Sequence, residues 1–336
     1  MLQIHDTLKS ILNSPANIVI TTHQSPDGDA IGSSLGLMHF LLQMKHKVNV
    51  IVPDAYPPFL QWMPGNSTII NFSDQPDIAQ KYISESAIIF CLDFNALSRI
   101  KQLGDLIQKS NSTKILIDHH RQPENFTAYS YVDINACSTS QLIYEFIASM
   151  EKIDLINKHI ATCLYAGIVT DTGSFRFPST TADTLRIAAH LIECGAENAL
   201  IYESIYDNYS ENRLRLLGYT LQHKMEVYKE SGAALICLSN NELNQFAFTK
   251  GDTEGIVNYP LSIEGIKLSV LVLEKDGVIK LSLRSKGKFS VNDMARKHFT
   301  GGGHANAAGA ISTLSYNETI QLLKNLFKQY AEEILK

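Results

Sequence analysis

The 336-residue sequence has no excess of positive charge and no long apolar run. Its net charge of −5 provides no overall basic field to attract long nucleic acids. No apolar stretch approaches the ~20 residues that a membrane-spanning helix needs. Residues 1–6 do not show a basic segment followed by an apolar core, as a signal peptide would. We therefore expect a cytoplasmic protein that does not contact a membrane or long double-stranded nucleic acid.

Closely spaced cysteine pairs are also absent. The five cysteines are scattered and form no C-x-x-C pair, which argues against both a disulfide framework and a thiolate zinc site. Most lie in apolar surroundings, and we expect reduced, buried thiols. The cysteines are Cys91, Cys137, Cys163, Cys194 and Cys237.

What the sequence does contain is a set of apolar runs, each followed at once by acidic residues or histidines. Such a run is typical of a buried strand, although periodicity alone also allows a buried helix. Because parallel strands end at one edge of a sheet, we expect these polar side chains to share one crevice. His23, Asp27 and Asp29 follow the run 17–22, Asp93 follows 86–92, Asp118, His119 and His120 follow 114–117, and Asp171 follows 165–170.

The first half of the chain alternates strand-like and helix-like segments, which predicts an α/β domain with a mostly parallel, doubly wound sheet. We expect this domain to span residues 1–185 and a helical connector to span 186–216. The predicted strands are 17–22, 47–52, 86–92 and 114–117, and the predicted helices are 30–45, 138–150, 154–169 and 181–194.

The second half predicts a smaller α/β domain with a mixed sheet over residues 217–336. An Asp-Gly pair at 276–277 is typical of a hairpin between two of its strands. A glycine-rich loop at 301–304 follows, and we expect the active site in the cleft between the two domains. The predicted strands are 233–238, 266–273 and 278–283, and the last helix covers 317–334.

The acidic residues and histidines of the first domain suit divalent metal ions. Taken singly, each has an ordinary structural explanation: Asp27 and Asp29 as a turn and a helix cap, and His23 as a strand-end residue. Together, so many carboxylates in one crevice would repel one another unless cations lay between them. Carboxylate and imidazole ligands without thiolate favour Mn²⁺ or Mg²⁺ over Zn²⁺. The set is too large for one ion and predicts two.

The second domain offers groups that could bind an anion. Gly301, Gly302 and Gly303 lack side chains, so their backbone N–H groups can approach a phosphate, and His304 can donate a further hydrogen bond. Arg284 can form a forked pair with phosphate. An edge-strand arginine and a flexible glycine turn are the ordinary alternatives.

These motifs resemble the DHH phosphoesterase family. The resemblance covers nearly the whole chain and rests on H-x-x-x-D-x-D at 23–29, Asp93, the triplet 118–120 and Asp171-Thr-Gly-Ser-Phe-Arg176. Gly301-Gly-Gly-His304 is similar to the signature of the C-terminal domain found in RecJ nucleases and nanoRNases. Length and domain content resemble most the nanoRNase (NrnA-like) type, which combines oligoribonuclease and pAp phosphatase activities.

The resemblance implies a Mn²⁺-dependent hydrolase, with Mg²⁺ as a possible substitute, in which a hydroxide held between two ions attacks phosphorus. One ion would bind His23, Asp27 and Asp93. The implied ligands of the second ion are Asp29, Asp93, His119 and Asp171, with Asp93 bridging the two. Asp93, His119 and His120 would form the catalytic group, with His119 or His120 as the alternative metal ligands. The implied substrate-binding residues are His120, Arg284, Ser285, Gly301, Gly302, Gly303 and His304.

The implied substrates are short RNA or DNA oligonucleotides, linear dinucleotides such as pApA, and adenosine 3′,5′-bisphosphate (pAp). A soluble cyclic-dinucleotide phosphodiesterase and a catalytically silent nucleotide-binding regulator remain the alternatives. The intact set of acidic residues argues against the silent regulator. A homodimer is compatible with the sequence.

Overall fold

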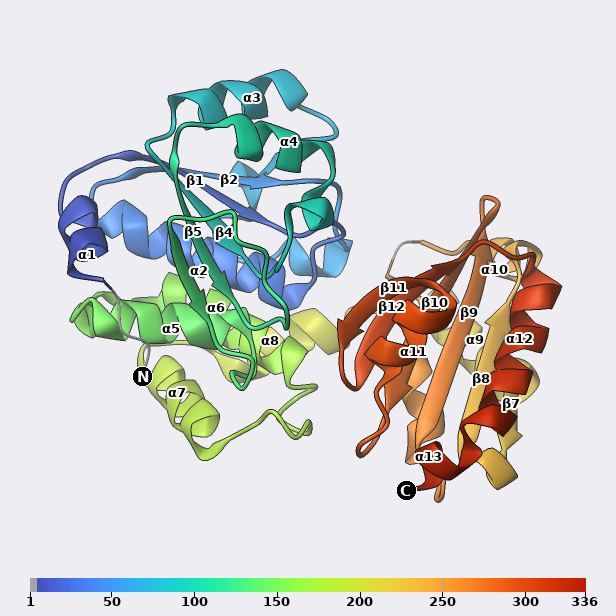
Figure 1. Cartoon of the computed structure of the whole chain (residues 1–336). Helices are drawn as coiled ribbons and strands as arrows, with labels where there is room; N and C mark the ends of the chain where they lie inside the picture. Colours follow the sequence, from blue (N-terminus) through green and yellow to red (C-terminus); the bar gives the residue numbers. More distant parts are fainter. Residues whose placement is uncertain (1–4, 250) are drawn as a thin grey trace. The chain divides into compact units, whose positions relative to one another are not determined.

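The computed structural model describes residues 5–249 and 251–336, and contacts divide the chain into two compact units, Met1–Asn208 and Tyr209–Lys336 (Figure 1). Residues 1–4, on which part of the signal-peptide argument rests, lie outside the described ranges. The division falls inside the segment 186–216 that the sequence assigns to the connector. Helix α8 (Asn198–Tyr206) belongs to the first unit, where Ile201 and Ile205 are buried in its core.

The first unit contains a six-stranded, all-parallel sheet with the order β3-β2-β1-β4-β5-β6. The chain leaves β1 first to one side and then returns to build the other, so the strand order reverses between β1 and β4. Ligands of doubly wound sheets bind beyond the carboxyl ends of the strands at such a reversal. The predicted sheet is confirmed. Its strands are β1 Asn17–Thr22, β2 Lys47–Val52, β3 Ile70–Asn71, β4 Ile88–Leu92, β5 Thr113–Asp118 and β6 Tyr129–Val132.

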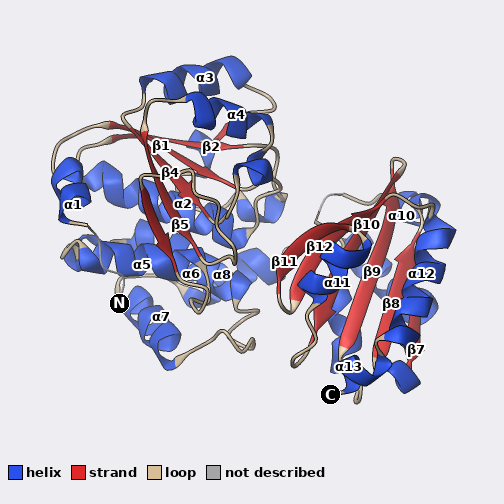
Figure 2. Cartoon of the chain, viewed as in Figure 1, coloured by secondary structure: helices blue, strands red, loops and turns tan. Residues whose placement is uncertain are grey.

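Helices cover both faces of this sheet (Figure 2), which explains why its strands are continuous apolar runs. In β1, Ile18 and Ile20 enter the core beneath α2, α5 and α6, whereas Val19 enters the core beneath α3 and α4. The helices of the unit, besides α8, are α1 Asp6–Leu12, α2 Gly28–Gln43, α3 Pro76–Glu85, α4 Gln102–Lys109, α5 Thr139–Ser149, α6 Lys158–Asp171 and α7 Ala182–Glu193.

Glycines let α2 and α6 pack closely. A Cβ atom added to Gly32 of α2 would lie 2.5 Å from the carbonyl oxygen of Cys163 in α6, and one added to Gly36 would lie 2.5 Å from Leu164 Cδ2. On α6, a Cβ atom at Gly167 would collide with the Ser140 hydroxyl of α5. Close packing of these helices brings the first turn of α2 to the last turn of α6.

The second unit has a six-stranded mixed sheet with the order β11-β12-β10-β9-β8-β7, as predicted. Strands β8 and β9 are parallel, and the other neighbours are antiparallel. The strands are β7 Met225–Tyr228, β8 Ala233–Leu238, β9 Leu268–Lys275, β10 Val278–Ser285, β11 Thr300–His304 and β12 Ala307–Ser312. The helices are α9 Glu211–Tyr219, α10 Asn240–Gln245, α11 Val291–His298, α12 Tyr316–Gln329 and α13 Ala331–Leu335.

Three local expectations are wrong. The apolar run before Asp171 is the end of helix α6, not a strand, because both the sheet and α2 bury it and no polar face is needed. The glycine-rich segment 301–304 is the edge strand β11, paired with β12, rather than a loop. The predicted last helix is interrupted at Tyr330, which separates α12 from α13.

Within the described ranges, no helix combines the length and the apolar character needed to cross a bilayer.

Candidate metal centre

The predicted metal ligands of the first unit converge at the carboxyl end of its sheet. His23 directly follows β1, and Asp93 directly follows β4. Asp27 caps α2, since its Oδ1 accepts hydrogen bonds from the backbone N–H groups of Asp29 (3.1 Å) and Ala30 (3.0 Å). This cap fixes the first turn of α2, which carries Asp29. Asp93 has a φ of +64°, a left-handed conformation that aspartate tolerates better than most residues.

One group of ligand atoms consists of His23, Asp27 and Asp93, which lie within 4.8 Å of one another. The Nε2 atom of His23 lies 3.4 Å from Asp93 Oδ2 and 3.7 Å from Asp27 Oδ2. Its Nδ1 atom lies 2.8 Å from the carbonyl oxygen of Gln24. When Nδ1 donates to that carbonyl, the lone pair of Nε2 points to the carboxylates, as in a metal-binding histidine.

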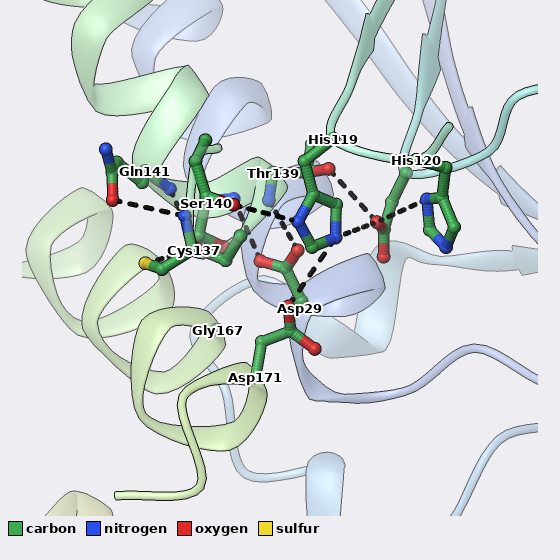
Figure 3. A network of polar contacts seen from close by, with 12 residues as sticks. Asp29, His119, His120, Cys137, Thr139, Ser140, Gln141, Gly167 and Asp171 are labelled. Atoms are coloured by element: carbon green, nitrogen blue, oxygen red, sulfur yellow. Dashed lines mark hydrogen bonds and ion pairs between the residues drawn. The ribbon is translucent and has the colours of Figure 1, made fainter. Parts of the chain in front are cut away.

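The second group consists of Asp29, His119 and Asp171, again within 4.8 Å (Figure 3). His119 Nε2 lies 3.5 Å from Asp171 Oδ2 and 3.4 Å from Asp93 Oδ1. Its Nδ1 atom lies 3.3 Å from the carbonyl oxygen of Ala136. The two oxygens of Asp93 thus face the two groups, Oδ2 toward His23 and Oδ1 toward His119.

His120 is oriented differently from His119. Its Nδ1 atom lies 2.7 Å from Oδ1 of the fully buried Asp118, and this contact fixes the imidazole. The Nδ1 atom is also 3.7 Å from Asp93 Oδ1, so His120 lies at the edge of the centre. Of the two histidines, His119 is the one whose Nε2 faces two carboxylates. This geometry favours His119 as the ligand.

The start of helix α5 supplies contacts that the sequence analysis missed. Backbone N–H groups of Thr139 and Ser140 donate to the two oxygens of Asp29, at 2.6 and 2.8 Å. The Thr139 hydroxyl donates to Asp93 Oδ1 at 3.0 Å. These contacts hold two ligands from a third element. The Ser-Thr-Ser run at 138–140, at the start of a predicted helix, was the available signal.

The donor atoms fit divalent cations. Ligands at ~2.1 Å from a common Mg²⁺ ion lie up to ~4.2 Å apart, close to the spacing within each group. Each group combines carboxylate oxygens with one imidazole nitrogen, and neither contains a thiolate. Such sets suit Mn²⁺ and Mg²⁺.

Known proteins share this arrangement. The N-terminal domain of the DHH family matches residues 17–168, and the DHHA1 domain matches residues 233–333. A probable bifunctional oligoribonuclease and PAP phosphatase NrnA from Streptococcus mutans is 32% identical over 96% of this chain and 98% of its own. The chain belongs to the DHH family.

Other relatives in the family also span both units. The Bacillus subtilis bifunctional oligoribonuclease and PAP phosphatase NrnA is 31% identical over 92% of this chain and 93% of its own. The crystal structure of an exopolyphosphatase-related protein from Bacteroides fragilis is 42% identical, with a TM-score of 0.94 over 98% of this chain and 97% of that one. As a DHH-family member, the chain is a hydrolytic enzyme.

Electrostatics in this DHH centre show how strongly its groups interact without a cation. Burial lowers the pKa of His23, but the hydrogen bond to Asp93 and the charge of Asp27 outweigh it and raise that pKa to about 9. Burial raises the pKa of Asp171 to about 7, with His119 acting in the opposite direction. Burial and the nearby charge of Asp93 raise the pKa of Asp29 well above its usual value. Protons therefore occupy part of the space that cations would take.

The DHHA1 unit carries the predicted anion-binding residues at one end of its sheet. Arg284 of β10 and His304 of β11 both pair with Ala307 of β12, which lies between them. The Gly303 N–H donates to Asn292 Oδ1 at 2.9 Å. The Ser285 hydroxyl donates to the carbonyl oxygen of Phe289 at 2.7 Å, so it already serves the fold. Gly301 and Gly302 lie on the same edge strand.

Proposed function

We propose that this DHH-family enzyme is a Mn²⁺-dependent phosphoesterase that hydrolyses short oligonucleotides, including linear dinucleotides such as pApA, and pAp. Mg²⁺ is the expected substitute ion. The observation that carries the proposal is the pair of ligand groups arranged about Asp93. Its two carboxylate oxygens face His23 and His119, so one side chain can serve two ions.

The residues divide into those that hold ions and those that act on the substrate. His23, Asp27 and Asp93 would hold one ion. Bound divalent ions supply charge that stabilises the developing phosphorane and lower the pKa of water. The second ion would be held by the set Asp29, Asp93, His119 and Asp171.

His120 is suited to a role on the substrate. Asp118 fixes its imidazole through Nδ1 at 2.7 Å, and a histidine fixed in this way can donate a hydrogen bond or a proton to a phosphate oxygen. Thr139 and Ser140 keep Asp29 in place through backbone N–H groups at the start of α5. In the second unit, Arg284 and His304 are suited to grip a terminal phosphate.

The substrate assignment rests on the relatives. Proteins named as bifunctional oligoribonucleases and PAP phosphatases share both domains with this chain at 31–32% identity and match it over nearly their whole length. The net charge of −5 offers long RNA no extended basic track. Short substrates therefore suit this chain best.

A substrate panel tests the proposal. Metal-free protein is supplied with Mn²⁺ or Mg²⁺ and incubated with pAp, pApA, a cyclic dinucleotide and a longer RNA, and released phosphate and AMP are measured. We expect turnover of pAp or pApA only with a divalent ion. Preferred turnover of the cyclic dinucleotide would assign the alternative phosphodiesterase activity. Nucleotide binding without turnover of any substrate would overturn the proposal in favour of a silent regulator.

A further inference from the structure

A second pocket lies beside the metal centre, within the first unit. It has a volume of about 230 Å³ and lies beyond the carboxyl ends of β1, β2 and β3. Gln24, Pro53 and Phe72, which each follow closely after one of these strands, line one part of it. Gln24 is the neighbour of His23 in the chain, and consecutive Cα atoms are ~3.8 Å apart. The pocket therefore adjoins the first ligand group.

The lining combines an apolar floor with polar ends. Pro53 and Ile100 are buried, and the half-buried Phe72 offers an aromatic surface. Lys101 and Gln102, just before and at the start of α4, complete the wall. Apolar pockets with a few polar groups are typical of small-molecule sites.

The polar groups of this pocket are available to a ligand. Among residues 5–249 and 251–336, the side-chain amides of Gln24 and Gln102 and the ammonium of Lys101 make no hydrogen bond or ion pair. An amide both donates and accepts, so it can match the edge of a nucleobase, as glutamine does with adenine. An aromatic side chain can stack on the base.

The backbone at Lys101 supports a functional reading. Its φ of +49° and ψ of −130° lie in a region that residues with a Cβ atom rarely adopt. The conformation persists because the turn is tied on both sides: the Lys101 N–H donates to Ser98 O at 3.4 Å and the Gly104 N–H donates to Lys101 O at 2.9 Å. Strained residues of this kind cluster at ligand-binding sites.

We propose that this pocket binds the nucleobase of the nucleotide next to the scissile phosphate, an inference that rests on the proposed function. Its volume of about 230 Å³ is smaller than the roughly 300–1,000 Å³ of pockets that enclose whole drug-sized ligands. It therefore suits one base rather than a stretch of oligonucleotide. Gln24 and Gln102 contact the base edge, Phe72 contacts its face, and Lys101 lies at the rim.

The experiment compares variants on substrates with and without a base. The holoenzyme and the double variant Lys101→Met/Gln102→Leu are assayed on pApA and on two analogues, each lacking one base. Lys109→Met, at the other end of α4, removes the same charge away from the pocket and is the control. Metal content is measured for every protein.

We expect the wild-type enzyme to cleave one of the two abasic analogues less efficiently than pApA, by about tenfold in kcat/KM. The double variant loses a similar factor on pApA, loses nothing further on that analogue, and keeps its metal. Lys109→Met behaves as wild type. Equal losses on pApA and both analogues, or no loss on pApA, would overturn the proposal.

The outcomes separate this inference from the proposed function. If wild-type protein cleaves pApA but the pocket variant shows no base-dependent loss, only the inference fails. If wild-type protein cleaves no dinucleotide, the proposed function fails, and calorimetric binding of AMP and ribose 5-phosphate decides the pocket. Tighter binding of AMP, lost in the double variant, supports a base site, and equal binding of the two overturns it.

Discussion

At the scale of single residues, Asp93 connects the whole metal centre. Its carboxylate lies between His23 and His119, at 3.4 Å from each Nε2 atom, and accepts a hydrogen bond from the Thr139 hydroxyl. The imidazoles and the hydrogen bonds hold the pKa of Asp93 well below its usual value despite burial, which raises it. Asp93 therefore stays ionised and can serve two cations at once.

Asp93→Asn tests this role with little change of shape. Asparagine tolerates the left-handed φ of +64°, so the fold should persist while one charge is lost. We expect metal content to fall for both ions and turnover to drop by at least ~10²-fold, since even residues that only orient ligands cost up to that factor. Elemental analysis and a phosphate-release assay measure both. Asp105→Asn, exposed on α4, is the control, and near-native activity of Asp93→Asn in Mn²⁺ would refute the shared-ligand assignment.

His23 predicts proton release when metal binds. Because its pKa is raised to about 9 in the metal-free protein, it carries a proton at neutral pH, whereas a metal ligand must be neutral. Metal affinity should therefore increase as pH rises toward 9. Calorimetry in two buffers with different protonation enthalpies should give different binding heats. Equal heats would contradict the prediction, and His23→Gln should reduce the difference.

At the scale of elements, the close packing of α2 against α6 sets the distance between Asp29 and Asp171. Gly28, Gly32 and Gly36 recur every four residues along α2, which places them on one face of the helix. Larger residues there would separate the two helices and with them the ligands that they carry.

Gly32→Ala should therefore weaken both stability and metal binding. Its Cβ would lie 2.5 Å from a backbone carbonyl of α6, and such overpacking costs ~1–3 kcal/mol. Gly218→Ala in α9 is the matched control, because nothing lies within 4 Å of its added Cβ and alanine favours a helix by ~0.5–1 kcal/mol. Thermal unfolding and Mn²⁺ titration measure the two effects. A stability gain in both variants would show that α2 and α6 can separate without cost.

At the scale of the whole molecule, the two units divide the work between them. The candidate metal ligands all belong to Met1–Asn208, whereas Arg284 and His304 belong to Tyr209–Lys336. Substitutions in one unit should therefore separate metal binding from substrate binding.

Arg284→Ala should raise KM and leave metal content unchanged. Loss of one charge-assisted contact to phosphate should cost ~1.5–3 kcal/mol in kcat/KM. Lys280→Ala removes a positive charge from the same strand and is the control. Steady-state kinetics and elemental analysis provide the readouts, and metal loss in Arg284→Ala would contradict the division of work.

Substrate length is the second property of the whole molecule. No added nucleic-acid-binding module occurs in the chain, and the net charge is −5, so a long strand gains little from further contacts. Turnover should be fastest on dinucleotides and fall steeply toward strands of about 24 nucleotides. Both lengths are compared under the same Mn²⁺ conditions. Equal or faster degradation of the long strand would point to a processive exonuclease instead.

The sequence by itself determined the strand order of events in the first unit and the identity of the charged residues. Apolar runs that end in Asp or His predicted strands β1, β4 and β5, because a strand covered on both faces needs no polar positions. The same argument misassigned the run before Asp171, since a helix buried on most sides is equally apolar. Composition alone cannot separate these two cases.

Tertiary structure decided which of these residues meet and how each is held. The approach of α2 to α6, the hydrogen bonds from the start of α5 to Asp29, and the different orientations of His119 and His120 join segments far apart in the chain. Such contacts depend on packing distances of a few tenths of an ångström, which residue types and their spacing do not encode. The pocket around Lys101 has the same origin, because three strand ends and one strained turn form it only after the sheet has assembled.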